Sequence, residues 1–171
     1  MPTLNPKAKK VMRLVETTVL RDERIALATK FFTCIKVNGD NPPTKGPLAG
    51  LLTGKKLPRF VVISRDKSVI KKVEGRVKAS TLFSAMKKVA RVDYKTSLSS
   101  YVTKMRKLLN ALDKLDQKEK AYKIALEKGK ARASEKKKIE RMRKKLKALE
   151  EKLNQIEMKD IKDKKVGRQR G

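Results

Sequence analysis

Two series of apolar residues, spaced alternately by three and four, constrain this chain of 171 residues more than any other feature. Such heptad spacing is typical of helices that pack against a partner along one seam. The first series is interrupted only at Glu119 and comprises Leu98, Tyr101, Met105, Leu108, Leu112, Leu115, Tyr122 and Leu126. The second comprises Ile139, Met142, Leu146, Leu149, Leu153 and Ile156. The sequence therefore predicts two long helices within residues 93–161.

The connection between the two series decides how the helices pair. The segment "EKGKARAS" (127–134) contains Gly129, a helix breaker, and the second series is out of phase with the first. An antiparallel helical hairpin would give each seam a partner in its own chain. One long helix with a stutter, forming a coiled coil with a second molecule, is the alternative. The remaining residues, 162–171, are predicted to form a disordered basic tail.

The charge of the chain indicates what it binds. There are 47 Lys and Arg residues against 18 Asp and Glu, a net charge of +29. Both parts share the excess, which is +15 over residues 1–92 and +14 over 93–171. A field of this size attracts polyanions such as nucleic acid or acidic protein. The densest cluster is predicted to bind a polyanion without sequence preference, and consists of Lys136, Lys137, Lys138, Arg141, Arg143, Lys144, Lys145 and Lys147.

The composition also removes several kinds of chemistry. There is no His, the commonest general base and metal ligand. The single cysteine, Cys34, excludes an intrachain disulfide and any Cys-based zinc site. We therefore expect no catalytic residue, no metal and no cofactor. No apolar run is long enough to span a membrane, and "MPTLNPKAKK" lacks the apolar middle of a signal peptide, so we expect a cytoplasmic protein.

Residues 1–92 show the pattern of a mixed α/β domain. A helix is predicted over 7–30, with a break at "LRDE" (20–23) where Asp22 could cap a second short helix. The run "FFTCIKV" (31–37) has the composition of a buried strand and would bury Cys34. A loop rich in Gly and Pro follows, with room for one helical turn around Pro47–Leu52. The later predicted elements are strands over 59–64 and 68–75, forming a hairpin, and an amphipathic helix over 79–92.

This order of elements resembles the thioredoxin-like fold, most closely the thioredoxin-like domains of bacterial proteins. The stretch "ETTVLRDERIALATKFFTCIKVNGD" (16–40) looks like the family's active-site helix and the strand after it. The stretch "LPRFVVISRDKSVIKKVEG" (57–75) looks like the family's proline-led hairpin. The family's proline is cis and faces the active site, so the resemblance implies a structural cis-proline at Pro58. It covers about half the chain.

The chain departs from that family at two points. Where the family carries its CxxC motif, this chain reads "NPKAKKVM" (5–12), and disulfide exchange needs two thiols. The family also places a central strand before the active-site helix, where only "MPTLNP" stands here. Three explanations stay open: the chain is a fragment of a longer one, residues 1–5 form a minimal strand, or another molecule fills the position.

The sequence therefore predicts a partial thioredoxin-like domain over 1–92 that lacks redox activity, followed by a basic helical hairpin or coiled coil over 93–161. We expect a non-catalytic binding or scaffolding protein, whose helical arm contacts a protein partner, a second copy or a polyanion. Two alternatives remain. One is a nucleic-acid-associated basic protein, and the other is a fragment of a thiol-disulfide oxidoreductase whose cysteines lie upstream.

Overall fold

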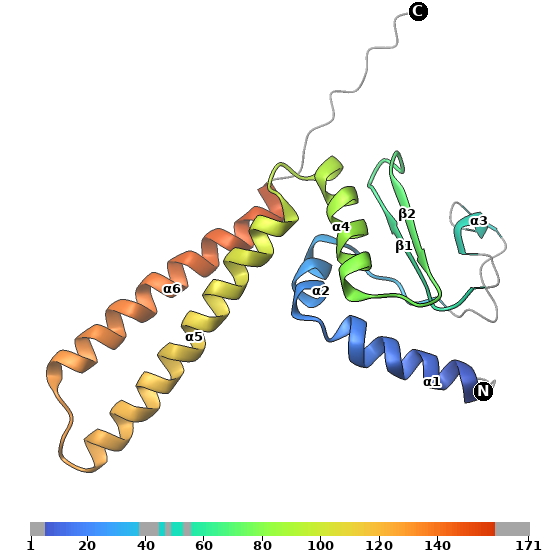
Figure 1. Cartoon of the computed structure of the whole chain (residues 1–171). Helices are drawn as coiled ribbons and strands as arrows, with labels where there is room; N and C mark the ends of the chain where they lie inside the picture. Colours follow the sequence, from blue (N-terminus) through green and yellow to red (C-terminus); the bar gives the residue numbers. More distant parts are fainter. Residues whose placement is uncertain (1–5, 38–44, 47–48, 53–55, 160–171) are drawn as a thin grey trace, which may run out of the picture. The chain divides into compact units, whose positions relative to one another are not determined.

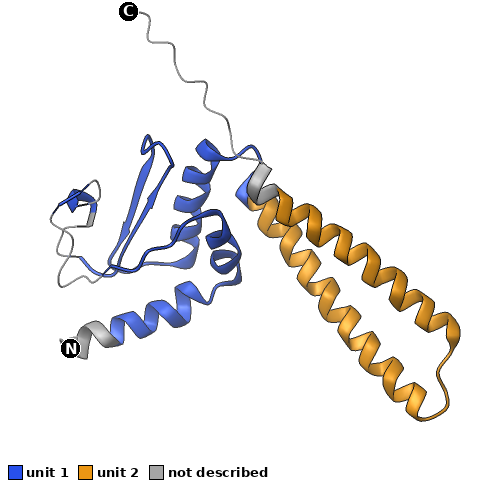
Figure 2. Cartoon of the chain, turned by 180° about the vertical axis from the view of Figure 1, so that it is seen from behind, with its two compact units in different colours: residues 1–98, 161–171 blue, residues 99–160 orange. Residues whose placement is uncertain are grey.

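The computed structural model describes residues 6–37, 45–46, 49–52 and 56–159 (Figure 1). Within these residues the chain is mixed α/β and mostly helical, with one two-stranded antiparallel sheet. It divides into two compact units, one of residues 1–98 with 161–171 and one of residues 99–160 (Figure 2). The predicted boundary, between residues 92 and 93, lies just before the end of the helix that closes the first unit.

The first unit begins with a broken helix, as the sequence predicts. Helix α1 (Pro6–Val15) continues into a π-helical turn η1 (Glu16–Leu20) before the chain turns into α2 (Glu23–Ala28). Asp22 caps α2 by accepting a hydrogen bond of 2.9 Å from the backbone N–H of Arg24. The guanidinium of Arg24 also hydrogen-bonds this carboxylate and lowers the pKa of Asp22. The predicted break and cap are therefore confirmed.

The predicted hairpin is also confirmed. Strand β1 (Arg59–Ile63) pairs antiparallel with β2 (Ile70–Glu74), with Phe60 opposite Val73. Ser64 stabilises the connecting turn, because its hydroxyl donates to Asp66 and accepts from the backbone N–H of Val69. The Leu57–Pro58 peptide bond that precedes β1 is cis, the isomer that the resemblance implies.

Helix α4 (Ala79–Asp93) forms the centre of the first unit's core. It packs against both strands and against α2 and η1. Val89 and Ala90 on α4 are almost fully buried, as are Val19 on η1 and Ile25 on α2. At its carboxyl end, buried Asp93 accepts a hydrogen bond of 3.0 Å from the backbone N–H of Arg65. This bond fixes the turn of the β-hairpin to the end of α4.

The strand predicted over 31–37 is wrong. Residues 29–31 form a short 3-10 helix, η2 (Thr29–Phe31), and 32–37 belong to no strand. Phe31 alone keeps a core position, where its ring contacts Tyr94 edge-on and its carbonyl accepts a bond from the Tyr94 hydroxyl. Cys34 is exposed and Ile35 is 71% exposed, so the expected burial of Cys34 is wrong as well. Among the described residues, this segment has no neighbouring strand to supply hydrogen bonds.

The remaining predictions for this unit fall partly outside the described residues. A helical turn, α3 (Ala49–Leu52), lies inside the range where one is predicted. The suggestion that residues 1–5 form a strand lies outside the described residues, and so does the predicted disorder of 162–171. The described residues form two strands only, so a complete thioredoxin-like sheet is not seen.

The second unit is a helical hairpin. Helix α5 (Leu98–Glu127) and helix α6 (Ala133–Lys159) run side by side in opposite directions in both views (Figures 1 and 2). Gly129 ends α5 with a φ of 67°, a conformation that glycine adopts without strain. Its N–H bonds to the carbonyl of Leu126, and the next N–H bonds to that of Ala125. The structure thus has the hairpin, one of the two arrangements that the seams allow.

The apolar seam holds the hairpin together along most of its length. Leu115 on α5 is 6% exposed, and Leu146 on α6 is 9% exposed. Leu108 and Leu153 are buried as well. Towards the connecting turn the seam opens, since Leu126 is 59% exposed. Arg143 and Glu119 join the two helices beside the seam with an ion pair of 2.7 Å.

Candidate polyanion-binding surface

The eight cationic residues predicted as a binding cluster all lie on α6, and all are exposed. They do not form one surface, because at 100° per residue they are spread around most of the helix. Arg143 is engaged with Glu119 across the hairpin through two hydrogen bonds, of 2.7 and 3.2 Å. The predicted cluster therefore has to be divided by the direction in which each residue points from the seam.

One flank of α6 carries cationic and uncharged residues and no carboxylate. Each position immediately before a seam residue lies about 100° to one side of the seam. On the described part of α6 these positions are occupied by Lys138, Arg141, Lys145, Ala148, Lys152 and Gln155. Three of them belong to the predicted cluster, and Lys152 extends the row by two turns.

On α5, too, the charge of a residue depends on whether it stands before or after a seam residue. The positions before its seam residues include Lys104, Lys107, Lys114 and Lys118, and none of these positions on α5 is acidic. The positions after its seam residues include the acidic residues Asp113, Asp116 and Glu127. On that side the Lys120 ammonium lies 2.7 Å from the Asp116 carboxylate, and this contact raises the pKa of Lys120. α5 thus also has one cationic flank and one flank of mixed charge.

The two cationic flanks lie on the same side of the hairpin. Both helices are right-handed and run in opposite directions, so stepping back one residue from either seam leads to the same side. The position of the Arg143–Glu119 pair agrees, since Arg143 follows a seam residue and bridges the helices on the opposite side. We define the basic face as the eight exposed residues Lys104, Lys107, Lys114, Lys118, Lys138, Arg141, Lys145 and Lys152.

The opposite side, the mixed face, carries both signs of charge. Its α6 positions after the seam include Glu140, Arg143, Lys147 and Glu150. Of the predicted cluster, Arg143 and Lys147 therefore lie beside carboxylates. Lys137 and Lys144 point away from the partner helix, and Lys136 lies towards the mixed face. By contrast, no residue of the basic face forms an ion pair with any described residue. The two faces differ in charge although they belong to the same two helices.

Sequence reasoning placed three residues of the basic face in the cluster and missed five. The missed residues are Lys152 and all four on α5, because they lie outside the densest run of cations along the chain. The signal that finds them is their position: each stands one residue before a seam position, which in the case of Lys118 is occupied by Glu119. Only the antiparallel pairing of the helices turns that repeated position into one surface.

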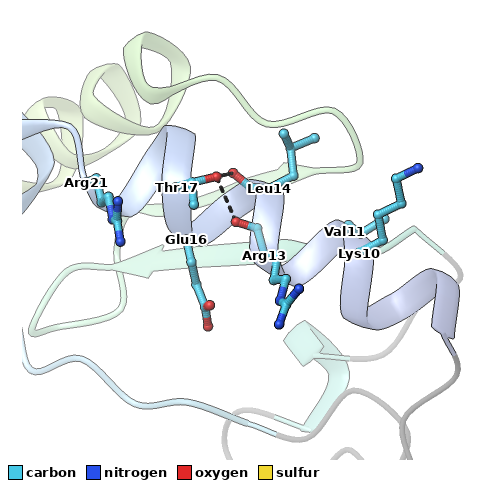
Figure 3. A pocket seen from close by; sticks show the side chains of 7 residues that line it. All are labelled: Lys10, Val11, Arg13, Leu14, Glu16, Thr17 and Arg21. Carbon is cyan, nitrogen blue, oxygen red and sulfur yellow. Dashed lines mark hydrogen bonds between the residues drawn. The ribbon is translucent and has the colours of Figure 1, made fainter.

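A second surface feature is a shallow hollow of about 550 Å³ along α1 and η1 (Figure 3). The hydroxyl of Thr17 donates to the carbonyls of Arg13 and Leu14 within it, at 2.9 and 3.2 Å. Leu14 is 61% exposed, so the hollow is open rather than an enclosed pocket. It is lined by Lys10, Val11, Arg13, Leu14, Glu16, Thr17 and Arg21, a set with no arrangement of acid, base and nucleophile.

Other kinds of site find little support in the described part of the chain. Its His, Cys, Asp and Glu residues form no group of three that could hold a metal ion. None of its helices combines the length and apolarity needed to cross a membrane. Cys34 lies on the surface with the carbonyl of Phe32 at 3.8 Å from its sulfur. Disulfide exchange within the chain would need a second thiol, and the sequence contains one cysteine.

No family model, no curated protein and no solved structure matches this chain. The resemblance to thioredoxin-like domains therefore rests on the sequence pattern of residues 16–40 and 57–75 alone. Function has to be argued from the surface of the chain itself.

Proposed function

We propose that this chain is a non-catalytic binding protein, in which the first unit is a folded platform and the helical hairpin binds a polyanion. The observation that carries this proposal is the basic face. Eight cations from two helices lie on one side with no carboxylate among them, while the other side mixes both signs. A solvated hairpin with no partner needs no such segregation, because interspersed charges serve solubility equally well.

The energetics favour an anionic ligand. Eight like charges on one side repel one another, and an anionic ligand relieves that repulsion as it binds. Each cation is exposed, so little desolvation opposes contact with an anionic group. Binding of this kind is fast and weakens with ionic strength, since exposed charges are screened within about 8 Å at physiological salt.

The same proposal includes the interpretation of the first unit as a thioredoxin-like domain. Its support is the hairpin introduced by Pro58 and followed by α4, together with the broken helix that precedes it. Without a CxxC motif such a domain would serve for binding rather than for redox chemistry. The alternative, a fragment of a thiol-disulfide oxidoreductase, would need cysteines from outside this chain.

The proposal is tested with two matched triple variants and heparin, a flexible polyanion. The basic-face variant is Lys114→Gln, Lys118→Gln, Lys145→Gln, and the mixed-face variant is Lys120→Gln, Lys123→Gln, Lys147→Gln. Each removes three exposed charges, two from α5 and one from α6. We expect the full chain to bind heparin at about 50 mM salt, and the basic-face variant to elute from a heparin column at clearly lower salt than the mixed-face variant.

Two results would contradict the proposal. One is a full chain that does not bind heparin, or binds it independently of salt. The other is equal weakening in the two variants, which would assign binding to net charge and not to the basic face. Circular dichroism of both variants checks that the helices are intact.

A further inference from the structure

From the layout of the basic face we infer that its polyanion is a nucleic-acid duplex, contacted through its phosphates by both helices at once. This inference rests on the proposed function and specifies the class of partner. Four features of the face carry it: its length, its two rows of cations, its lack of aromatic side chains and its lack of large apolar side chains.

The length of the face fits a ligand of high linear charge density. On α6 the row from Lys138 to Lys152 extends about 21 Å at 1.5 Å per residue. On α5 the row from Lys104 to Lys118 has the same length. Duplex DNA carries one negative charge per about 1.7 Å of its axis, so a segment of that length offers about twelve phosphates. Eight cations can therefore each find a phosphate, whereas a protein surface rarely concentrates carboxylates to that density.

The two rows overlap along part of the hairpin. The Glu119–Arg143 pair fixes the register of the hairpin, and places Lys118 level with about residue 144 and Lys114 level with about residue 148. Packed helices have axes about 8–10 Å apart, and lysine side chains on the outer flanks reach farther. This separation is comparable to the major groove of B-DNA, about 12 Å wide. Where the rows overlap, cations of the two helices can thus meet the phosphates on the two sides of one groove.

The side chains that are absent from the face exclude the nearest alternatives. Single strands are held by aromatic side chains on which bases stack. The tyrosines of the hairpin are not on the face, since Tyr101 is fully buried and Tyr122 lies on the seam. Membrane surfaces are held by large apolar side chains beside the cations. The other positions on this side of the hairpin carry no large apolar side chain, and are Ser100, Ala111, Ala121, Ala125, Ala148 and Gln155.

The face also predicts the character of the binding. Seven of its eight cations are lysines, which neutralise phosphates as point charges, and Arg141 is the exception. Binding should therefore be independent of base sequence, because phosphate contacts position a protein and do not read bases. If all eight contact phosphate, the slope of log affinity against log salt should reach about −7.

The test measures binding of the full chain to three labelled probes by fluorescence anisotropy between 50 and 200 mM salt. The probes are a DNA duplex of 20 base pairs, one strand of that duplex, and poly-glutamate of similar charge. We expect the duplex to bind tightest. For the duplex, the slope of log affinity against log salt should be less negative by about 2.7 in the basic-face variant, since three contacts at about 0.9 each are removed. The mixed-face variant should keep the wild-type slope.

The outcomes separate the inference from the proposed function. If poly-glutamate or the single strand binds as tightly as the duplex, and the basic-face variant still weakens binding, the duplex inference is wrong and the polyanion proposal stands. A preference for vesicles containing phosphatidylserine over the duplex would overturn the inference in the same way. If neither heparin nor any of the three probes binds, the proposed function itself is wrong.

Discussion

The two units of this chain both carry a large excess of positive charge but arrange it differently. In the first unit the cations surround an α/β core whose buried residues come from seven separate elements. In the hairpin the fold itself sorts the charges, because a residue's step from the seam decides which face it joins. Net charge alone therefore says little about function, while charge sorted by a regular fold points to a surface.

The largest effect is expected from a substitution in the apolar seam of the hairpin. Leu115 is 6% exposed, so Leu115→Asp places a charge where water cannot reach it. The substitution should lower the unfolding free energy by about 3 kcal/mol or more. We expect the variant to lose helicity by circular dichroism and to lose the basic face with it. Leu126→Asp is the control, since that side chain is 59% exposed and should change the unfolding free energy by no more than about 0.5 kcal/mol. Equal effects at both positions would mean that the seam does not hold the helices together.

In the first unit, the cap of α2 offers a smaller test. Asp22→Ala removes the bond to the Arg24 N–H and should lower the unfolding free energy by about 1 kcal/mol in denaturant melts. The pKa of Asp22 is lower in the folded chain than its value of 3.8 in the unfolded chain. Its charge therefore stabilises the fold at pH above 3.8, and this stabilisation is lost as the pH falls through the pKa of the folded chain. The difference in unfolding free energy between wild type and variant should therefore become smaller below about pH 4. A difference that stays constant down to pH 2 would show that the charge of Asp22 is not coupled to folding.

The smallest effect is expected at Cys34. Its side chain is exposed, so Cys34→Ser should change the unfolding free energy by no more than about 0.5 kcal/mol. A thiol reagent should modify the folded wild type without prior unfolding. A loss above 1 kcal/mol, or protection of the thiol until the chain unfolds, would restore the buried strand that the sequence predicts over 31–37.

The hairpin is the part of the fold that sequence predicts best. Its helices arise from contacts repeated every three or four residues, and its turn from the left-handed conformation at Gly129, so each signal is local. The strands at 59–63 and 70–74 are predictable for a similar reason, since a short turn joins them. The run "FFTCIKV" fails because a strand needs a neighbour, and its own composition cannot show whether a neighbour exists.

The candidate surface was predictable only in part. A dense run of lysines on α6 drew attention to Lys138, Arg141 and Lys145, which do belong to the basic face. It also drew in Arg143, which pairs with Glu119 instead. The contribution of α5 could not be read from charge density, because its cations are more widely spaced and alternate with carboxylates over residues 113–120. They separate only when the helix is wound and its partner is known.

The central claim is that the hairpin, and not the overall charge of the chain, binds the polyanion. The most direct measurement compares two triple variants in duplex binding at about 100 mM salt: the basic-face variant, and Lys71→Gln, Lys72→Gln, Lys88→Gln, which removes three exposed charges from the first unit. We expect the basic-face variant to lose at least tenfold in affinity, roughly 1.4 kcal/mol, and the first-unit variant to stay within about threefold of wild type. Equal losses in the two variants, or a larger loss in the first-unit variant, would contradict the central claim.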